Sequence, residues 1–418
     1  MLMAIVSMYK MNYSILGLAL ITAVIGVRQG SPTSCFLFTV FVNTLIRNLK
    51  QCAPERYLGW LHCLMLMDDT VLLATTRESM REKLIVLQNF CNESGMIINE
   101  KKTKFFVING DDESNAPFVL DQVTPNVTVK WCKEYVYLGC RFTADGKLSS
   151  SLMSHAKDKV QHLNKLITFM TVNKDIPFQA KRKVLEAAFN SAILYGCESW
   201  LKCSLAPVKT LYLTAIKVVL GVRQSTPNDI ALVEIGLPSL DTLVLTKQEK
   251  FFRNILEKRE HMLDDPFMHV FRLVADSSLG HHITRVALGR HVEPNDPADN
   301  IRTAVGSKFA IYRVINPSLE CPSIYTTACH RVPEYMRISF TRMRTSSHRL
   351  RVETGRWARL NRDERLCICG QDVQDEEHVL QYCNVVDHLR PAGITFPECL
   401  QNDVPYKAIH EIIEVFET

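Results

Sequence analysis

The stretch from Trp60 to Thr76 reads Trp-Leu-His-Cys-Leu-Met-Leu-Met-Asp-Asp-Thr-Val-Leu-Leu-Ala-Thr-Thr and decides the fold. Asp68 and Asp69 lie between two apolar runs of strand length, a pattern that predicts a β-hairpin with the two acids at its turn. Unpaired carboxylates are costly in an apolar setting, so a divalent cation, a basic partner or open solvent must compensate them. Taken alone, the pair fits an ordinary exposed turn equally well.

The composition is that of a globular protein without a strong charge bias. The chain has 418 residues, of which 47% are hydrophobic and 22% charged, and this length predicts roughly two to four domains. A formal net charge of +5 permits a polyanionic partner without requiring one. The 14 cysteines lie mostly inside apolar segments, which indicates reduced thiols in an intracellular protein of the nucleus or cytoplasm. The apolar run Ile15–Ile25 is too short to span a bilayer and precedes no cleavage pattern, so we expect no membrane segment and no signal peptide.

A glycine-rich loop precedes the hairpin in the chain. Residues 26–32 read Gly-Val-Arg-Gln-Gly-Ser-Pro and are followed by the apolar stretch Phe36–Leu49. Ser31 suits a helix cap and Pro32 the first helical position, so the pattern predicts a loop that opens a helix. A helix N-terminus preceded by Arg28 is a natural anion site, although many ordinary turns share this composition.

Four motifs in one order are far more specific than any one of them. The glycine-rich loop and the Asp-Asp hairpin are followed by Gly95–Thr103, which reads Gly-Met-Ile-Ile-Asn-Glu-Lys-Lys-Thr, and by a second hairpin pattern from Tyr135 to Gly146. This order resembles the palm of the reverse transcriptases of non-LTR (LINE-type) retrotransposons. The resemblance implies an RNA-directed DNA polymerase that uses an RNA template, a DNA primer, deoxynucleoside triphosphates and two Mg²⁺ or Mn²⁺ ions.

The same resemblance assigns roles to individual residues. Asp68 would be the principal metal ligand, with Asp69 beside it. Lys101 or Lys102 would act on the pyrophosphate, and a solvated surface position for both lysines is the alternative. The remaining implied contacts are Arg28, Gln29 and Gly30 at the incoming nucleotide, and Tyr137, Leu138 and Gly139 at the primer end.

The sequence also departs from the family pattern. Family members carry another aspartate upstream of the glycine-rich loop, whereas this chain has no Asp before Asp68 and its only acid in that span is Glu55. We therefore expect an N-terminally truncated fragment that lacks the first catalytic strand and the fingers and is catalytically impaired. Leu66 and Met67 replace the usual aromatic and small residue before the acidic pair.

The fold expected is α+β, a polymerase palm remnant followed by helical segments and a small zinc-knuckle-like module. The palm would occupy residues 1–149, with a helix at 77–95 and strands at 104–109 and 127–142. A helical thumb at 150–239 would hold helices at 152–171, 178–201 and 205–221, and a helical connector would follow at 240–335. Residues 336–418 would form an arginine-rich segment with a zinc knuckle.

The segment from Arg337 to Arg365 is the best local nucleic-acid footprint in the sequence. Its nine arginines face only three acids, and arginine forks bind phosphate and stack on bases. A salt-bridged helical surface is the alternative. The candidate contacts are Arg342, Arg344, Arg349, Arg351, Arg356 and Trp357.

Immediately afterwards come Cys367, Cys369, His378 and Cys383, three thiols and one imidazole that suit a tetrahedral zinc ion. His388 or Cys399 could replace one ligand, and reduced cysteines without metal remain open.

The leading function is therefore reverse transcription, impaired in this fragment. The alternative is a non-catalytic RNA-binding retroelement remnant that uses the thumb, the arginine-rich segment and the knuckle.

Overall fold

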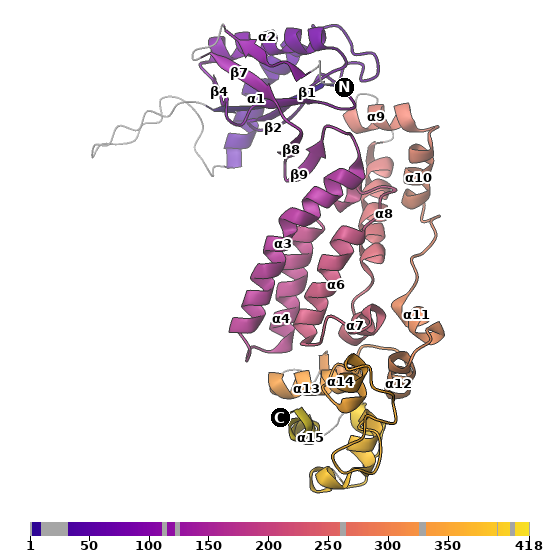
Figure 1. Cartoon of the computed structure of the whole chain (residues 1–418). Coiled ribbons are helices and arrows are strands. Elements are labelled where there is room, and N and C mark those ends of the chain that lie inside the picture. The colour runs from indigo at the N-terminus through magenta and orange to yellow at the C-terminus, as the bar shows by residue number, and fades with distance from the viewer. Residues whose placement is uncertain are drawn as a thin grey trace, which may run out of the picture. The chain divides into compact units, whose positions relative to one another are not determined.

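The structure is a computed structural model that describes residues 2–9, 32–110, 115–121, 126–259, 265–325, 332–390, 392–401 and 406–417. These residues form two compact units, each with its own internal packing. Unit 1 comprises residues 1–155, 200–203 and 250–289, and unit 2 comprises residues 156–199, 204–249 and 290–418. The elements of both units are labelled in Figure 1.

A mixed sheet forms the centre of unit 1. Its strands follow the order β2-β3-β1-β5-β7-β6, with β4 paired to β1, and every pairing is antiparallel except the parallel pair β5 and β7. The strand bounds are β1 Leu2–Tyr9, β2 Cys63–Leu66, β3 Asp69–Ala74, β4 Ile97–Ile98, β5 Lys104–Val107, β6 Phe118–Leu120 and β7 Val127–Trp131. β1, which the sequence analysis did not predict, lies between the acidic hairpin and β5.

The predicted hairpin with acids at its turn is confirmed. β2 and β3 pair antiparallel with Leu66 opposite Asp69, so Met67 and Asp68 form a two-residue turn. Met67 adopts a φ of 56°, a left-handed conformation that is uncommon for a residue with a long side chain. Asp69 is therefore the first residue of β3 rather than a member of the loop.

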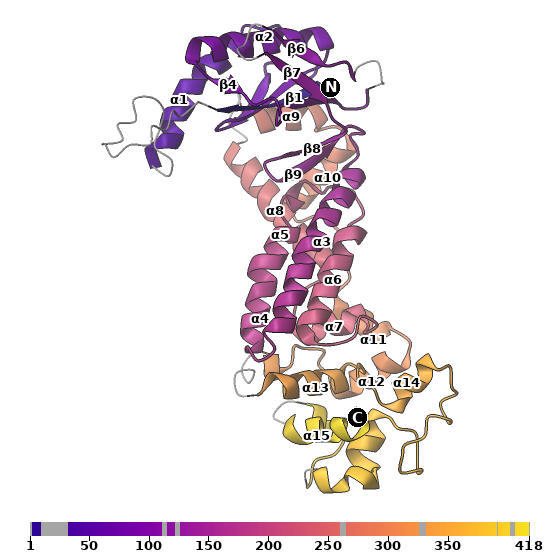
Figure 2. The same ribbon diagram turned by 60° about the vertical axis from the view of Figure 1, so that its left-hand side comes forward.

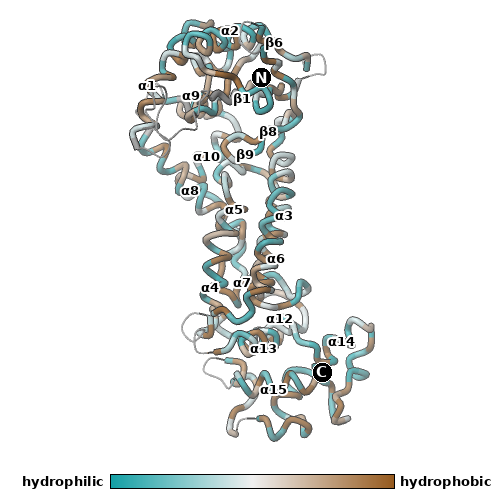
Figure 3. Tube along the Cα trace, turned by 90° about the vertical axis from the view of Figure 1, so that its left-hand side faces the viewer, coloured by the Kyte–Doolittle hydropathy of each residue, from teal (hydrophilic) through white to brown (hydrophobic). Residues whose placement is uncertain are grey.

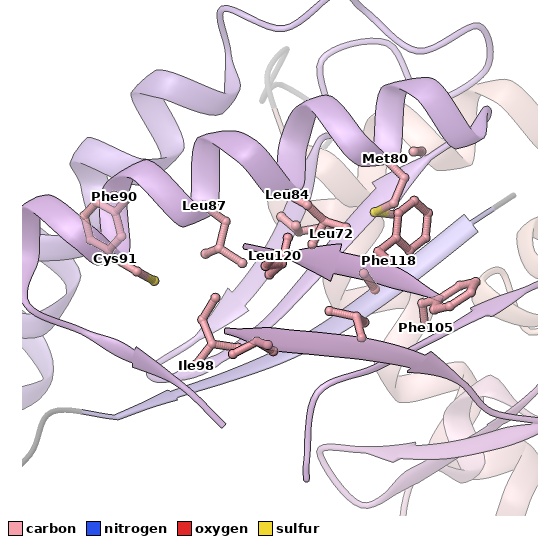
Figure 4. Close-up of a cluster of buried hydrophobic side chains, with 14 of the residues drawn as sticks. Leu72, Met80, Leu84, Leu87, Phe90, Cys91, Ile98, Phe105, Phe118 and Leu120 are labelled. Carbon is pink, nitrogen blue, oxygen red and sulfur yellow. The ribbon is translucent and has the colours of Figure 1, made fainter. Parts of the chain in front are cut away.

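Helix α2 (Arg77–Ser94) covers one face of the sheet. Thr76 caps its start by accepting a hydrogen bond from the Ser79 backbone N–H at 3.1 Å, and Gly95 ends it with a φ of 64°. Figure 4 shows its apolar side chains pointing at the strands, where they form one buried cluster with strand residues. The labelled members are Leu72, Met80, Leu84, Leu87, Phe90, Cys91, Ile98, Phe105, Phe118 and Leu120. Leu45 and Leu49 of α1 (Pro32–Leu49) belong to the same cluster.

The opposite face of the sheet is covered by a second hairpin, β8 (Glu134–Tyr137) and β9 (Cys140–Thr143). Val71, Leu73 and Phe106 form a buried cluster on this face, and the hairpin packs Tyr135, Tyr137 and Phe142 against it. The prediction of one strand over 127–142 is wrong, because the chain breaks after β7 and turns at Leu138 and Gly139. Both turn residues have positive φ, 49° and 78°, as a two-residue hairpin turn of this kind requires.

The remaining elements are helical. Unit 1 also contains α9 (Pro266–Val274) and α10 (Ser278–Ala287). Helices α3, α4 and α6 lie side by side in two views (Figure 1, Figure 2), and hydrophobic and hydrophilic stretches alternate along α4 and α6 (Figure 3). The bounds are α3 Leu148–Val172, α4 Phe178–Val184, α5 Ser191–Ile193, α6 Ala206–Leu220, α7 Asn228–Ile235, α8 Leu240–Arg259, α11 Pro297–Thr303, α12 Ser307–Ile315, α13 Glu334–Arg344, α14 Arg351–Trp357 and α15 Tyr406–Glu417.

The predicted helix over 178–201 ends early. It runs through α4, a π-helical turn at Leu185–Asn190 and α5, and stops at Ile193, where Leu194 leaves the helical conformation. Helices α6 and α7 end at Gly221 and Gly236, which adopt the left-handed conformation that favours glycine. None of the helices in the described ranges has the length and apolarity needed to cross a membrane.

Candidate functional site

The acidic turn of the β2–β3 hairpin is flanked by β1. Asp68 is exposed and Asp69 is half-buried. In the sheet register Asp69 pairs with Leu66 on one side and with Ser7 of β1 on the other. The two residues follow one another at one end of the hairpin, and the Asp68 charge acts on the Asp69 carboxyl.

The electrostatics of the pair favour a cation. Burial raises the pKa of the Asp69 carboxyl, the Asp68 charge raises it further, and the positive charge of Lys102 opposes both effects. The raised pKa of Asp69 therefore has burial as its first cause and the neighbouring Asp68 charge as its second, and Lys102 offsets them only in part. Mg²⁺ prefers hard oxygen ligands, which is the kind of ligand that Asp68 and Asp69 carry.

The β8–β9 hairpin lies close to the acidic pair. The pKa of Tyr135 and of Tyr137 is raised by burial and then by the charge of Asp69. The Tyr135 hydroxyl donates a hydrogen bond to the Lys102 carbonyl oxygen at 2.8 Å. The structure therefore brings together three sequence-predicted motifs, namely the acidic turn, the lysine segment and the aromatic hairpin.

Tyr135 was not among the predicted contact residues. The signal was present, because Tyr135 and Tyr137 are two positions apart in one strand and therefore share a face. Leu138 and Gly139 form the turn itself. Lys101 and Lys102 are both exposed, and Lys102 is the one that lowers the pKa of Asp69.

In the part of the chain that the structure describes, no third His, Cys, Asp or Glu joins Asp68 and Asp69 in a group that could hold a metal ion. β1 reads Leu-Met-Ala-Ile-Val-Ser-Met-Tyr and carries no acid. Glu55 is bound elsewhere, because it accepts hydrogen bonds from Lys83 and Ser79 and from both the backbone and the hydroxyl of Thr75. A further metal ligand would therefore have to come from outside these residues. Arg28, Gln29 and Gly30 of the predicted nucleotide contact lie outside the described residues.

A second candidate centre lies in unit 2. Cys367, Cys369, His378 and Cys383 place their ligand atoms within 4.8 Å of one another, and within the described ranges this is the one group of three or more His, Cys, Asp or Glu residues that could hold a metal ion. The two sulfur atoms of Cys367 and Cys383 are 3.6 Å apart, and Cys369 Sγ lies 3.2 Å from His378 Nε2. Three thiols and one imidazole are a donor set that suits zinc, and the Cys367–Cys383 distance falls in the range of about 3.5 to 3.8 Å expected between ligands of a tetrahedral zinc ion.

Local backbone structure builds this Cys/His cluster. Gly370 adopts a φ of 73° between the second and third ligands, and its N–H donates to the Cys367 carbonyl at 2.9 Å. The Asp375 side chain accepts from the His378 backbone N–H at 3.0 Å and so positions the start of the helical turn that carries the imidazole. The two substitutes left open by the sequence, His388 and Cys399, lie outside the cluster.

The arginine-rich segment divides into buried and accessible residues. Arg344 is only 2% exposed, and its Nε donates to Glu234 at 2.8 Å. Arg337 is likewise buried against Glu334. Arg344 was a predicted nucleic-acid contact, but an arginine buried in an ion pair cannot reach a partner at the surface.

The other predicted contacts are more accessible. Arg351 is exposed and donates to the Leu366 carbonyl at 3.0 Å, and Arg356 is half-buried and pairs with Glu353 at 3.2 Å. Trp357 is 51% exposed. Arg342 is half-buried and Arg349 exposed.

Comparisons with known proteins agree with this arrangement. Residues 4–142 match the reverse transcriptase (RNA-dependent DNA polymerase) family. The chain is also similar to the retrovirus-related Pol polyprotein from type-2 retrotransposable element R2DM of Drosophila melanogaster, with 28% identity over 148 residues. That match covers 34% of this chain and 14% of the relative. Taken together, the family match and the similarity to a retrotransposon polyprotein confirm the expected resemblance to the reverse transcriptases of non-LTR retrotransposons.

Proposed function

We propose that the chain acts in RNA-templated DNA synthesis, with the acidic turn of its reverse transcriptase domain as the polymerase metal site. The observation that carries this proposal is the position of Asp68 and Asp69 at a hairpin turn within the matched residues 4–142. Reverse transcriptases use an RNA template, a primer and nucleotides. We expect these substrates for this chain.

The roles of the residues follow from their positions. Asp68 and Asp69 hold a divalent ion through their carboxylate oxygens, and Asp69 is in its ionised form when it does so. Such an ion lowers the pKa of a primer hydroxyl or stabilises the leaving pyrophosphate. Lys102 supplies a positive charge next to the acidic pair for the phosphates. The turn at Leu138 and Gly139, held by Tyr135 and Tyr137, supports the primer end.

One observation favours impaired catalysis. Two metal ions need more carboxylate ligands than one ion does. The strand next to Asp69 is β1, which has Ser7 at the position paired with Asp69 and contains no acidic residue. We therefore propose that the chain by itself binds one ion and extends primers slowly. The alternative is a non-catalytic RNA-binding protein that uses the helices and the Cys/His cluster of unit 2.

Primer extension distinguishes these functions. The purified chain is given an RNA template, a DNA primer, nucleotides and Mg²⁺, alongside Asp68→Asn and the control Asp121→Asn, which lies outside the hairpin. We expect weak extension that Asp68→Asn abolishes and the control retains. Robust extension that depends on Asp68 would contradict the proposed catalytic impairment and no other part of the proposed function. Absence of extension together with retained RNA binding favours the non-catalytic alternative.

The Cys/His cluster of unit 2 is proposed as a structural zinc site. All four positions are filled by protein ligands, which is the arrangement of structural rather than catalytic zinc. Cys367, His378 and Cys383 are buried, so the ion would be shielded from solvent. The expected role is to hold together the short turns around it, since residues 358–390 contain little regular secondary structure.

A further inference from the structure

A pocket of about 420 Å³ lies in unit 2 where the end of α6 meets the loop after α13. Arginine is the commonest residue in its lining, and one carboxylate opposes the three guanidinium groups. The lining residues are Gly221, Val222, Arg223, Arg342, Ser347, Arg349 and Glu417. Segments more than one hundred residues apart in the chain meet here, since Ser347 Oγ accepts from the Arg223 backbone N–H at 2.8 Å.

Two of the arginines are held in place by contacts on their outer sides. Arg342 donates through Nε to the Gly221 carbonyl at 2.9 Å. The Arg223 guanidinium lies 4.1 Å from the centre of the Trp357 ring, a stacking contact that fixes its plane. Its Nη1 is buried and has no hydrogen-bond partner among the described residues. A buried N–H without an acceptor is costly, so this donor is suited to a ligand.

The charged residues that line the pocket are mostly positive. Burial lowers the pKa of Arg223 and of Arg342. The carboxylate of Glu417 opposes this effect at both arginines and that of Glu353 opposes it at Arg223, whereas Arg349 adds to it. Glu417 is partly engaged already, because its Oε1 accepts from the Arg349 backbone N–H at 2.6 Å. By contrast, the neighbouring Arg344 is neutralised by Glu234. The pocket therefore gathers like charges at a cost that a bound anion would remove.

We propose that this pocket binds a phosphate group of single-stranded RNA through Arg223, Arg342 and Arg349. Planar guanidinium forks match the oxygens of phosphate bidentately, and Trp357 beside Arg223 offers a face for a neighbouring base. Inorganic phosphate shares the chemistry of the RNA backbone. The choice of RNA as its source rests on the proposed function, whereas the anion pocket itself rests on the geometry alone.

Fluorescence anisotropy with a short labelled single-stranded RNA tests the proposal on the full chain. We expect Arg223→Gln and Arg342→Gln each to weaken binding about 10- to 100-fold, the effect of losing a charge-assisted hydrogen bond. Each should also lower the slope of log affinity against log salt by about 0.7, which corresponds to one lost phosphate contact on a single strand. Glu417→Gln removes the opposing charge and should tighten binding.

The matched control is Arg302→Gln, which removes one exposed arginine charge from the same unit and should leave affinity and salt slope unchanged. If Arg223→Gln fails to fold without its Trp357 contact, Arg349→Gln serves instead, because that side chain is exposed and the Glu417 bond uses its backbone. Equal affinity for wild type and all three arginine variants overturns the proposal, even if the chain binds RNA well, in which case the proposed function survives.

Binding of inorganic phosphate distinguishes an anion pocket in general from a pocket for the RNA backbone. A rise in unfolding temperature with phosphate, seen for the wild type and Arg302→Gln but not for Arg223→Gln, supports the anion pocket without reference to RNA. The same rise in a chain that binds no RNA overturns RNA as the source and contradicts the proposed function at the same time.

Discussion

At the scale of single residues, the acidic turn combines a functional pair with a strained neighbour. Met67 has a φ of 56° immediately before Asp68, a conformation that costs a residue with a side chain about 1 to 2 kcal/mol. The strain is tolerated because the paired strands on either side determine the turn. Functional sites commonly contain strained backbone, so a strained turn that carries two carboxylates agrees with a functional role.

Met67→Gly should therefore stabilise unit 1. Glycine removes the strain but adds chain entropy in the unfolded state, so we expect the free energy of unfolding to rise by about 1 kcal/mol. Urea unfolding followed by circular dichroism measures the change. Met65→Gly is the matched control, because Met65 lies in β2 in extended backbone and packs on the core, and there glycine should destabilise. Equal destabilisation by both variants would show that the Met67 backbone is unstrained.

The Glu55 carboxylate should make stability depend on pH. Burial opposes its ionisation, but hydrogen bonds from Lys83, Ser79 and Thr75 outweigh burial and lower its pKa to about 2. Because the folded pKa is below that of the unfolded chain, the stabilisation is present above the unfolded value of 4.5 and is lost as pH falls toward 2. The gap in unfolding free energy between wild type and Glu55→Gln should shrink by roughly 2 kcal/mol between neutral pH and about pH 3. A gap that stays constant with pH contradicts the shift.

At the scale of elements, α2 shows which features helical periodicity predicts and which features depend on tertiary contacts. The helix predicted at 77–95 is confirmed, and its buried residues Leu84, Leu87, Phe90 and Cys91 recur at helical spacing. Lys83 is fully buried beside that face, where it donates to the Leu73 carbonyl at 2.5 Å and pairs with Glu55. A lysine would be assigned to the solvent face by pattern alone.

Leu84→Ala should destabilise unit 1 by about 3 kcal/mol, because the side chain is 1% exposed and truncation leaves a cavity between α2 and the sheet. The adjacent Ile85 is 46% exposed, so Ile85→Ala should cost less than about 1 kcal/mol. Chemical unfolding of the two variants gives the comparison. Equal losses would mean that α2 does not pack as described.

At the end of α13 and in the loop that follows it, the same residue type has two different roles. Arg344→Gln leaves Glu234 buried without its partner and should lower the stability of unit 2 by roughly 3 to 5 kcal/mol. Arg349→Gln removes an exposed side chain and should change stability by less than about 0.5 kcal/mol. Thermal unfolding of unit 2 distinguishes them. A mild effect of Arg344→Gln would show that water reaches the ion pair.

At the scale of the whole molecule, the two units are stabilised by different means. Unit 1 has a sheet with a hydrophobic cluster on each face. Unit 2 combines packed helices with buried ion pairs and the four-residue Cys/His cluster. Since each unit has its own packing, loss of one should be separable from loss of the other.

Removal of zinc should affect unit 2 selectively. Chelation, or Cys367→Ser, should lower the unfolding temperature of unit 2 and leave the transition of unit 1 unchanged, because metal binding contributes directly to folding only where the ligands lie. Calorimetry and elemental analysis measure both effects. Cys399→Ser, a cysteine outside the cluster, should retain zinc. Intact protein without zinc would refute the metal site.

Local patterns in the sequence determined much of this protein. The acidic hairpin, the buried face of α2, the glycine ends of α6 and α7 and the Cys/His ligand set all follow from spacing and caps within a few residues. The family resemblance came from the order of such motifs. These features depend on backbone geometry that neighbouring residues set by themselves.

Only the tertiary structure decided the pairings between distant segments. Glu55 meets Lys83, Glu234 meets Arg344, and Arg223 comes to lie beside Arg342 and Trp357. The placement of β1 next to the acidic hairpin belongs to the same group. A charged residue has the same local signature whether it is solvated or buried against a partner, and the partner is supplied by chain folding rather than by sequence neighbours.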